Sequence, residues 1–137
     1  MRSRIVKLSS FLPVLILGAT LSSATGALAA GLDTQDSQAN GVSVSVKPAD
    51  VTAANWRFEV TLTTHSGSLD DDLTKSATLL AGGKQYAATG WDGSAPGGHH
   101  RKGVLSFKAV TPRPEGIELR IARQGETAPR AFRWKLN

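Results

Sequence analysis

The chain has 137 residues, with 16 basic and 11 acidic side chains, a formal charge of +5 and no cysteine. The lack of cysteine excludes disulfide bonds, a thiolate nucleophile and thiolate metal sites. The fold must therefore depend on a conventional hydrophobic core, and the length suits one domain.

The first 29 residues have the three-part pattern of a secretory signal peptide. Three basic residues lie within the first seven positions, residues 11–21 are mostly apolar, and Ala27-Leu28-Ala29 supplies the small residues that a signal peptidase recognises. The apolar stretch is shorter than the ~20 residues that span a membrane. We therefore predict cleavage after Ala29 and an exported protein, periplasmic or secreted, with no membrane span after cleavage.

Cleavage would also change the charge of the protein. Three basic and no acidic residues precede Ala29, so the mature chain would carry a net charge of only +2. That value is ordinary for a soluble domain and does not indicate a basic surface for nucleic acid. No nucleic-acid partner is expected.

Residues 30–40 are polar and have no hydrophobic period, so they are predicted to form a flexible leader. The folded domain is expected over residues 41–137, where apolar and polar residues alternate as in half-buried strands. Turn residues separate the alternating segments. Strands are predicted at residues 42–47, 56–63, 77–80, 85–91, 104–109, 117–122 and 132–137.

About seven short antiparallel strands favour an all-β fold, an immunoglobulin-like sandwich of two sheets. A small closed β-barrel is the alternative, because both architectures show the same alternation. The core is expected to contain Trp56, Phe58, Leu105, Phe107, Phe132 and Trp134.

Two long connections interrupt the predicted strands, at residues 65–75 and 91–103. Long loops on a rigid sandwich are where binding groups usually lie. If the parity of Leu105 and Phe107 extends back along the strand, His99 and Arg101 point inward while His100 and Lys102 point outward. The predicted binding loop comprises Trp91, Asp92, Gly97, Gly98, His99, His100 and Arg101.

All three histidines fall in or beside these two loops, and imidazole is a common ligand of zinc and copper. A ZnII or CuII site is therefore one hypothesis, with His65, His99, His100 and Asp72 as candidate ligands. The alternative is structural, because His99 and Arg101 could hydrogen-bond loop carbonyls and the acidic cluster at residues 70–72. Residues 70–73 are expected to form a single helical turn whose first residues are acidic. Under the structural interpretation no cofactor is expected.

Several pieces of the chain resemble a recurring group of small exported prokaryotic β-sandwich domains with no established activity. The most specific piece is Gly97-Gly98-His99-His100-Arg101-x-Gly103-x-Leu105-x-Phe107. Thr64-His65-Ser66, Asp72-Leu73, Trp91-x-Gly93 and Phe132-x-Trp134 also contribute. The resemblance covers most of the chain from Gly41 onward, and it implies that both long loops are characteristic features of the domain. It implies no substrate and no catalytic residue.

The sequence does not indicate an enzyme, because the chain contains no Gly-x-Ser-x-Gly motif and its candidate acids cluster in one loop. The favoured hypothesis is a monomeric, non-catalytic interaction module that binds an envelope or extracellular macromolecule. The first alternative is a periplasmic zinc- or copper-binding protein. The second is a structural subunit that exchanges strands, with residues 31–40 as the donor.

Overall fold

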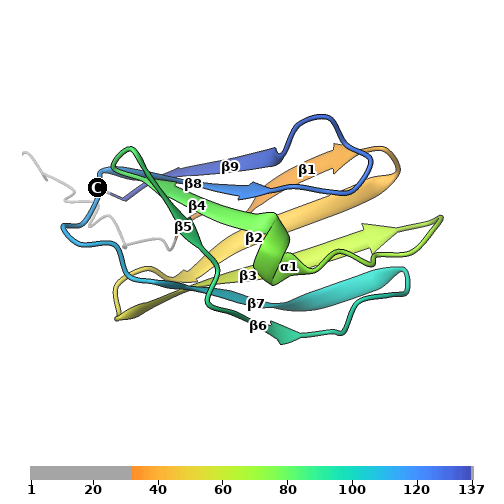
Figure 1. Ribbon diagram of the computed structural model, residues 1–137, viewed down its shortest axis with the longest axis horizontal. Coiled ribbons are helices and arrows are strands. Elements are labelled where there is room, and N and C mark those ends of the chain that lie inside the picture. Colours follow the sequence, from red (N-terminus) through yellow and green to blue (C-terminus); the bar gives the residue numbers. More distant parts are fainter. Residues whose placement is uncertain (1–31, 137) are drawn as a thin grey trace, which may run out of the picture.

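A computed structural model describes residues 32–136, which form two antiparallel sheets packed face to face (Figure 1). The predicted signal peptide lies outside the described residues. One sheet has the strand order β1-β2-β3-β7-β6 and the other the order β5-β4-β8-β9. The strands are β1 (Gln35–Ala39), β2 (Val42–Asp50), β3 (Asn55–Thr64), β4 (Ala77–Ala81), β5 (Lys84–Ala87), β6 (Gly90–Gly93), β7 (His100–Lys108), β8 (Gly116–Ile121) and β9 (Arg130–Lys135).

The order of the strands is that of an immunoglobulin-like sandwich. Strands β2-β3-β7-β6 correspond to the A-B-E-D sheet of such a domain, and β4-β8-β9 to its C-F-G sheet. The two sheets do not join into a barrel, so the predicted fold class is confirmed. The helix α1 (Leu73–Ser76) has four residues, and no helix of the described part is long and apolar enough to cross a membrane.

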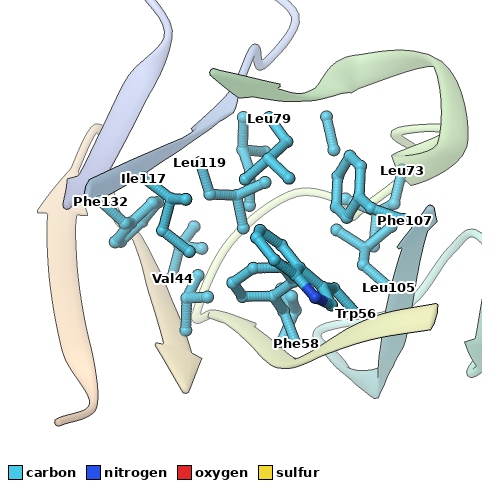
Figure 2. Close-up of a cluster of buried hydrophobic side chains, with 14 of the residues drawn as sticks. Val44, Trp56, Phe58, Leu73, Leu79, Leu105, Phe107, Ile117, Leu119 and Phe132 are labelled. Carbon is cyan, nitrogen blue, oxygen red and sulfur yellow. The ribbon is translucent and has the colours of Figure 1, made fainter. Parts of the chain in front are cut away.

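Alternation along the strands builds the core, as the sequence predicts. In β3, Trp56, Phe58, Val60 and Leu62 are buried while the residues between them are not. Figure 2 shows Trp56 and Phe58 of one sheet facing Leu79 and Leu119 of the other. The Phe58 ring meets Phe107 edge to face, with centroids 5.7 Å apart. All of the residues expected in the core are buried: Trp56, Phe58, Leu105, Phe107, Phe132 and Trp134.

The flexible leader predicted for residues 30–40 is wrong for residues 35–40. Gln35–Ala39 form β1, an edge strand that pairs antiparallel with β2 of the same chain. Asn40 and Gly41 connect the two strands with φ values of 50° and 74°, as a two-residue hairpin turn requires. Asn-Gly is a strong hairpin signal, but β1 has no buried residue and so lacks the apolar alternation on which the strand predictions rest.

Hydrogen bonds from β9 hold the polar strand β1 in place. The side-chain amide of Gln35 accepts from the Arg133 backbone N at 2.9 Å and also donates to the Arg133 carbonyl. The Trp134 Nε1 donates to the Asp33 carbonyl at 2.7 Å. Arg130, which is buried, donates to two β1 carbonyls at 3.1 and 2.8 Å. These bonds link the edges of the two sheets on one side of the sandwich.

The single strand predicted at residues 85–91 is instead two short strands in opposite sheets. β5 pairs with β4, while β6 pairs with β7, and residues 88–89 carry the chain between the sheets. Strand β7 begins at His100, earlier than predicted. The early start of β7 places the Gly/His segment directly beside the end of β3.

Candidate functional site

The two long loops meet at one end of the sandwich. The loop between β3 and α1 (residues 65–72) and the loop between β6 and β7 (residues 94–99) lie at the right in Figure 1, with the β1–β2 turn and the β8–β9 loop (residues 122–129). We call this group of four connections the loop end. Backbone hydrogen bonds join the two long loops, from Leu69 N to Gly98 O at 3.0 Å and from Gly97 N to Leu69 O at 2.9 Å.

The buried side chain of Arg101 stabilises this junction by hydrogen bonds to both long loops. Its side chain points inward, as predicted, and the residue is only 1% exposed. One terminal nitrogen, Nη1, donates to the carbonyls of Leu69 at 3.2 Å and Asp71 at 2.6 Å, and the other, Nη2, donates to the Ser94 carbonyl at 3.3 Å. Arg101 therefore has the structural role that the sequence offered as an alternative to metal binding.

Trp91 covers the guanidinium of Arg101. The Arg101 Cζ lies 5.6 Å from the centroid of the indole ring, a cation–π distance, and Trp91 Nε1 donates to the Ser94 carbonyl at 2.9 Å. The ring also lies over Gly103, where an added Cβ would approach Trp91 Cζ2 to 2.7 Å. Trp91 and Arg101, both predicted to belong to a binding loop, thus hold the two long loops together through contacts within the domain.

The prediction that His99 points inward is wrong, because His99 is exposed. Strand β7 begins only at the next residue, and Gly97 and Gly98 have φ values of 116° and 72°, so the strand parity does not extend to His99. Its carbonyl oxygen accepts from the Thr64 backbone N at 2.9 Å. The predicted outward positions of His100 and Lys102 are confirmed.

His100 and His65 are also exposed at the loop end. The Nδ1 of His100 lies 3.1 Å from the Thr63 hydroxyl on the neighbouring strand, while the ring of His65 has no hydrogen bond within residues 32–136. Nowhere in that range do three His, Asp or Glu side chains gather closely enough to hold a metal ion. The predicted ligands therefore share one end of the domain but do not form a coordination sphere.

Asp72, the fourth candidate ligand, is the N-cap of α1. Its carboxylate accepts from the Thr74 hydroxyl at 2.6 Å and from the Thr74 backbone N at 3.1 Å. The hydroxyl hydrogen bond is the main reason that the pKa of Asp72 lies below its usual value. The expected helical turn thus exists but begins at Leu73, so the acids precede the helix instead of forming its first turn.

A chain of ion pairs at the loop end was not predicted. Asp71 pairs with Arg123 at 2.9 Å, Arg123 approaches Glu126 at 3.7 Å, and Glu126 pairs with Arg130 at 2.6 Å. Arg130 then donates to the Val42 carbonyl at 2.8 Å, just beyond the β1–β2 turn. The chain joins three of the four connections. One member of this chain could have been predicted from the sequence. Arg130 lies two residues before Phe132, so the alternation of the strand places both side chains on the inner face.

Most of the exposed side chains at the loop end are polar. Asp92 and Gly98 of the predicted binding loop are exposed, and Gly97 is partly buried against the 65–72 loop. Ser68 and Asp70 bond to each other at 2.7 Å on its surface. Further exposed residues there are His65, Ser66, Ala95, Pro96, His99, Gln124 and Gly125.

Comparison with known proteins identifies no family. No protein-family model matches the chain, and no curated protein matches it significantly. The group suggested by the Gly-Gly-His-His-Arg segment therefore remains a resemblance. A similar solved structure is MPT63, a secreted protein from Mycobacterium tuberculosis, with 14% sequence identity and a TM-score of 0.46 over 77% of this chain and 92% of that chain.

Proposed function

We propose that this protein is an exported, non-catalytic interaction module of the cell envelope, and that it binds its macromolecular partner through the loop end. The observation that carries the proposal is the junction around Arg101, which fixes two long loops in one arrangement. A binding surface that is already ordered loses less conformational entropy when the partner binds.

The residues that fix the loops are distinct from those that face the solvent. Arg101, Asp71 and Arg130 are committed to contacts within the domain, while His65, Ser68 and His99 are exposed. Such a division is typical of loops that recognise a partner, which are held by a rigid scaffold and exposed at their tips. The exposed side chains of His65, Ser68 and His99 would bind the partner through hydrogen bonds from their hydroxyl and imidazole groups.

The non-catalytic part of the proposal depends on how the acids of the loop are used. Asp71 forms an ion pair with Arg123, and Asp72 caps α1. Both carboxylates are thus engaged in contacts within the domain, which supports a non-catalytic role. Export is supported by the signal-peptide pattern of residues 1–29.

Site-specific crosslinking in cells that export the protein tests the proposal. A photoreactive amino acid at Ser68 or His99 should give a discrete adduct with one envelope or extracellular macromolecule. The same amino acid at Lys84, an exposed residue of β5 far from the loop end, is the control. Equal adducts from all three positions, or none from Ser68 and His99, would refute the role of the loop end.

A further inference from the structure

A shallow groove lies on the outer face of the β5-β4-β8-β9 sheet, at the end of the domain opposite the loop end. Its volume is about 600 Å³. In Figure 1 this end is at the left, where the β4–β5 connection lies close to the end of β9. The groove is separate from every residue of the candidate functional site.

The floor of the groove exists because two glycines lie side by side. Ala81 pairs with Ile117, so the antiparallel register places Gly82 opposite Gly116. Neither residue has a side chain to cover the outer face. Gly82 lies in the two-residue β4–β5 turn with a φ of 55°, a conformation that glycine readily adopts, and a Cβ on Gly116 would meet the Trp134 carbonyl at 3.2 Å.

The wall of the groove is apolar on one side and charged on the other. Leu80 pairs with Glu118, and Glu118 pairs with Arg133, so the three side chains form one row across the sheet. Leu80 is only partly buried although it is an aliphatic residue in the middle of a sheet. Gly116 pairs with Lys135 in the next row, which places a second cation at the edge of the floor.

Positive charge exceeds negative charge around the groove. Glu118 is the one acid among its lining residues, and it is already paired with Arg133 at 2.6 Å and with Arg120 at 3.0 Å. The Arg133 side chain remains 72% exposed despite this ion pair, and Lys135 is exposed. The groove thus offers an apolar floor beside cationic groups that still have free donors.

The size of the groove indicates a small ligand. A volume of about 600 Å³ falls within the usual range of small-molecule sites, ~300–1,000 Å³. Ten residues line it, whereas a stable protein–protein interface uses roughly 20–30 residues on each side. We propose that the groove binds a fatty-acid carboxylate, with its chain over Gly82 and Gly116 against Leu80 and its carboxylate at Arg133 and Lys135. This proposal does not depend on the role of the loop end.

A titration with three probes that share a twelve-carbon chain tests the charge and the place of binding. The mature protein, labelled with ¹⁵N, is titrated below the micellar concentration with dodecanoate, dodecanol or dodecyltrimethylammonium. Dodecanoate should shift the amide signals of Gly82, Gly83, Gly116 and Lys135, and it should bind roughly tenfold more tightly than dodecanol because of its charge-assisted hydrogen bonds. Dodecyltrimethylammonium should bind most weakly.

Three variants test the assignment of residues. Lys135→Gln should weaken dodecanoate roughly three- to tenfold and leave dodecanol unchanged, since it removes only an exposed charge. Leu80→Ser should weaken both probes. Lys108→Gln, which removes an exposed charge from β7 of the other sheet, should weaken neither. Equal affinity for the three probes, shifts confined to other residues, or no effect of Lys135→Gln would overturn the proposal.

Discussion

The guanidinium of Arg130 donates two hydrogen bonds to the carboxylate of Glu126, from Nη2 at 2.6 Å and from Nε at 3.1 Å. Arg130 faces the interior from β9, and Glu126 lies in the β8–β9 loop. The buried guanidinium of Arg130 therefore donates hydrogen bonds to the Glu126 carboxylate and to three backbone carbonyls at the same time. It is the point at which the β8–β9 loop and the β1–β2 hairpin are joined.

This pair makes stability depend on pH in the acid range. The hydrogen bond from Arg130 holds the pKa of Glu126 below the ordinary value of 4.5. As the pH falls below 4.5, the unfolded chain therefore binds a proton at this position before the folded chain does. Above pH 4.5, the stabilisation from the ion pair should be complete. It should decrease as the pH falls below 4.5, and be lost once the pH has fallen through the lower pKa of Glu126 in the folded protein.

The variant Glu126→Gln should accordingly be less stable than the parent at pH 7 and approach it at low pH. Melting temperatures measured from pH 7 down to strongly acid solution check this result. Glu115→Gln, which changes an exposed acid, is the matched control and should follow the parent. Parallel curves for Glu126→Gln and the parent would disprove the linkage.

Removing the charge of Arg101 should destabilise the junction of the long loops by about 1–3 kcal/mol, the cost of leaving one partly buried carbonyl without a donor. The Leu69 carbonyl keeps a donor in Gly97 N, and the Ser94 carbonyl keeps one in Trp91 Nε1. The Asp71 carbonyl loses its bond from Arg101. Urea denaturation of Arg101→Met measures the cost.

Lys102→Met is the control for Arg101→Met, because Lys102 is the exposed neighbour of Arg101 on the same strand. It should change the free energy of unfolding by less than about 0.5 kcal/mol. Hydrogen exchange of the backbone amides of residues 65–72 should also become faster in Arg101→Met but not in Lys102→Met. If both variants unfold alike, Arg101 does not lock the loops.

Gly103 should tolerate no side chain. A Cβ there would lie 2.6 Å from the Asp92 carbonyl and 2.7 Å from the Trp91 ring, so Gly103→Ala should cost about 1–3 kcal/mol through overpacking. Gly90→Ala is the control on the adjacent strand, since an added Cβ at Gly90 meets nothing within 4 Å. Chemical denaturation of the two variants should separate them, and equal stability would mean that both the β6 backbone at Asp92 and the Trp91 ring can shift at little cost.

The two tryptophans of the core should be costly to truncate. Trp56 is 2% exposed and Trp134 is 6% exposed, and replacing either with Ala should cost about 3–5 kcal/mol. Trp134→Phe should cost less, because it keeps most of the packing and loses the hydrogen bond to the Asp33 carbonyl. A loss below about 1 kcal/mol for either Ala variant in urea would contradict their place in the core.

Zinc and copper should change the melting temperature little, and so should the double change His99→Ala, His100→Ala. Both imidazoles are exposed, so their removal should shift the free energy of unfolding by less than about 0.5 kcal/mol. A bound ion present at a hundred times its dissociation constant would instead add about 2.7 kcal/mol. A gain of that size in the free energy of unfolding, absent from the double variant, would instead support the metal-site hypothesis.

Sequence reasoning succeeded where burial imposes a period of two. Trp56, Phe58 and Ile117 alternate with polar residues, and this pattern alone identifies their strands. The pattern left a sandwich and a small barrel open, and the strand order decides for the sandwich. Sequence reasoning failed for Gln35–Ala39, because hydrogen bonds of the Arg130 and Gln35 side chains with the facing strand hold β1 without any buried apolar residue.

The candidate site was predicted less well than the fold. The parity of the strand correctly places Arg101 inside and Lys102 outside, but the strand begins only at His100, so extending its parity to His99 misplaces that residue. The ion pair between Asp71 and Arg123 joins residues 52 positions apart. No local pattern shows such a contact, because it depends on how the loops of both sheets meet.

The hydrogen bond from Trp134 to Asp33 has a consequence for the order in which the domain folds. It joins residues 101 positions apart, and the bonds from Gln35 and Arg130 span 98 and 93 positions. The first strand can therefore gain these partners only when residues 130–134 are available, and contacts of such long range form slowly. A chain exported in extended form would therefore complete the contacts of its first strand only after residues 130–134 had crossed.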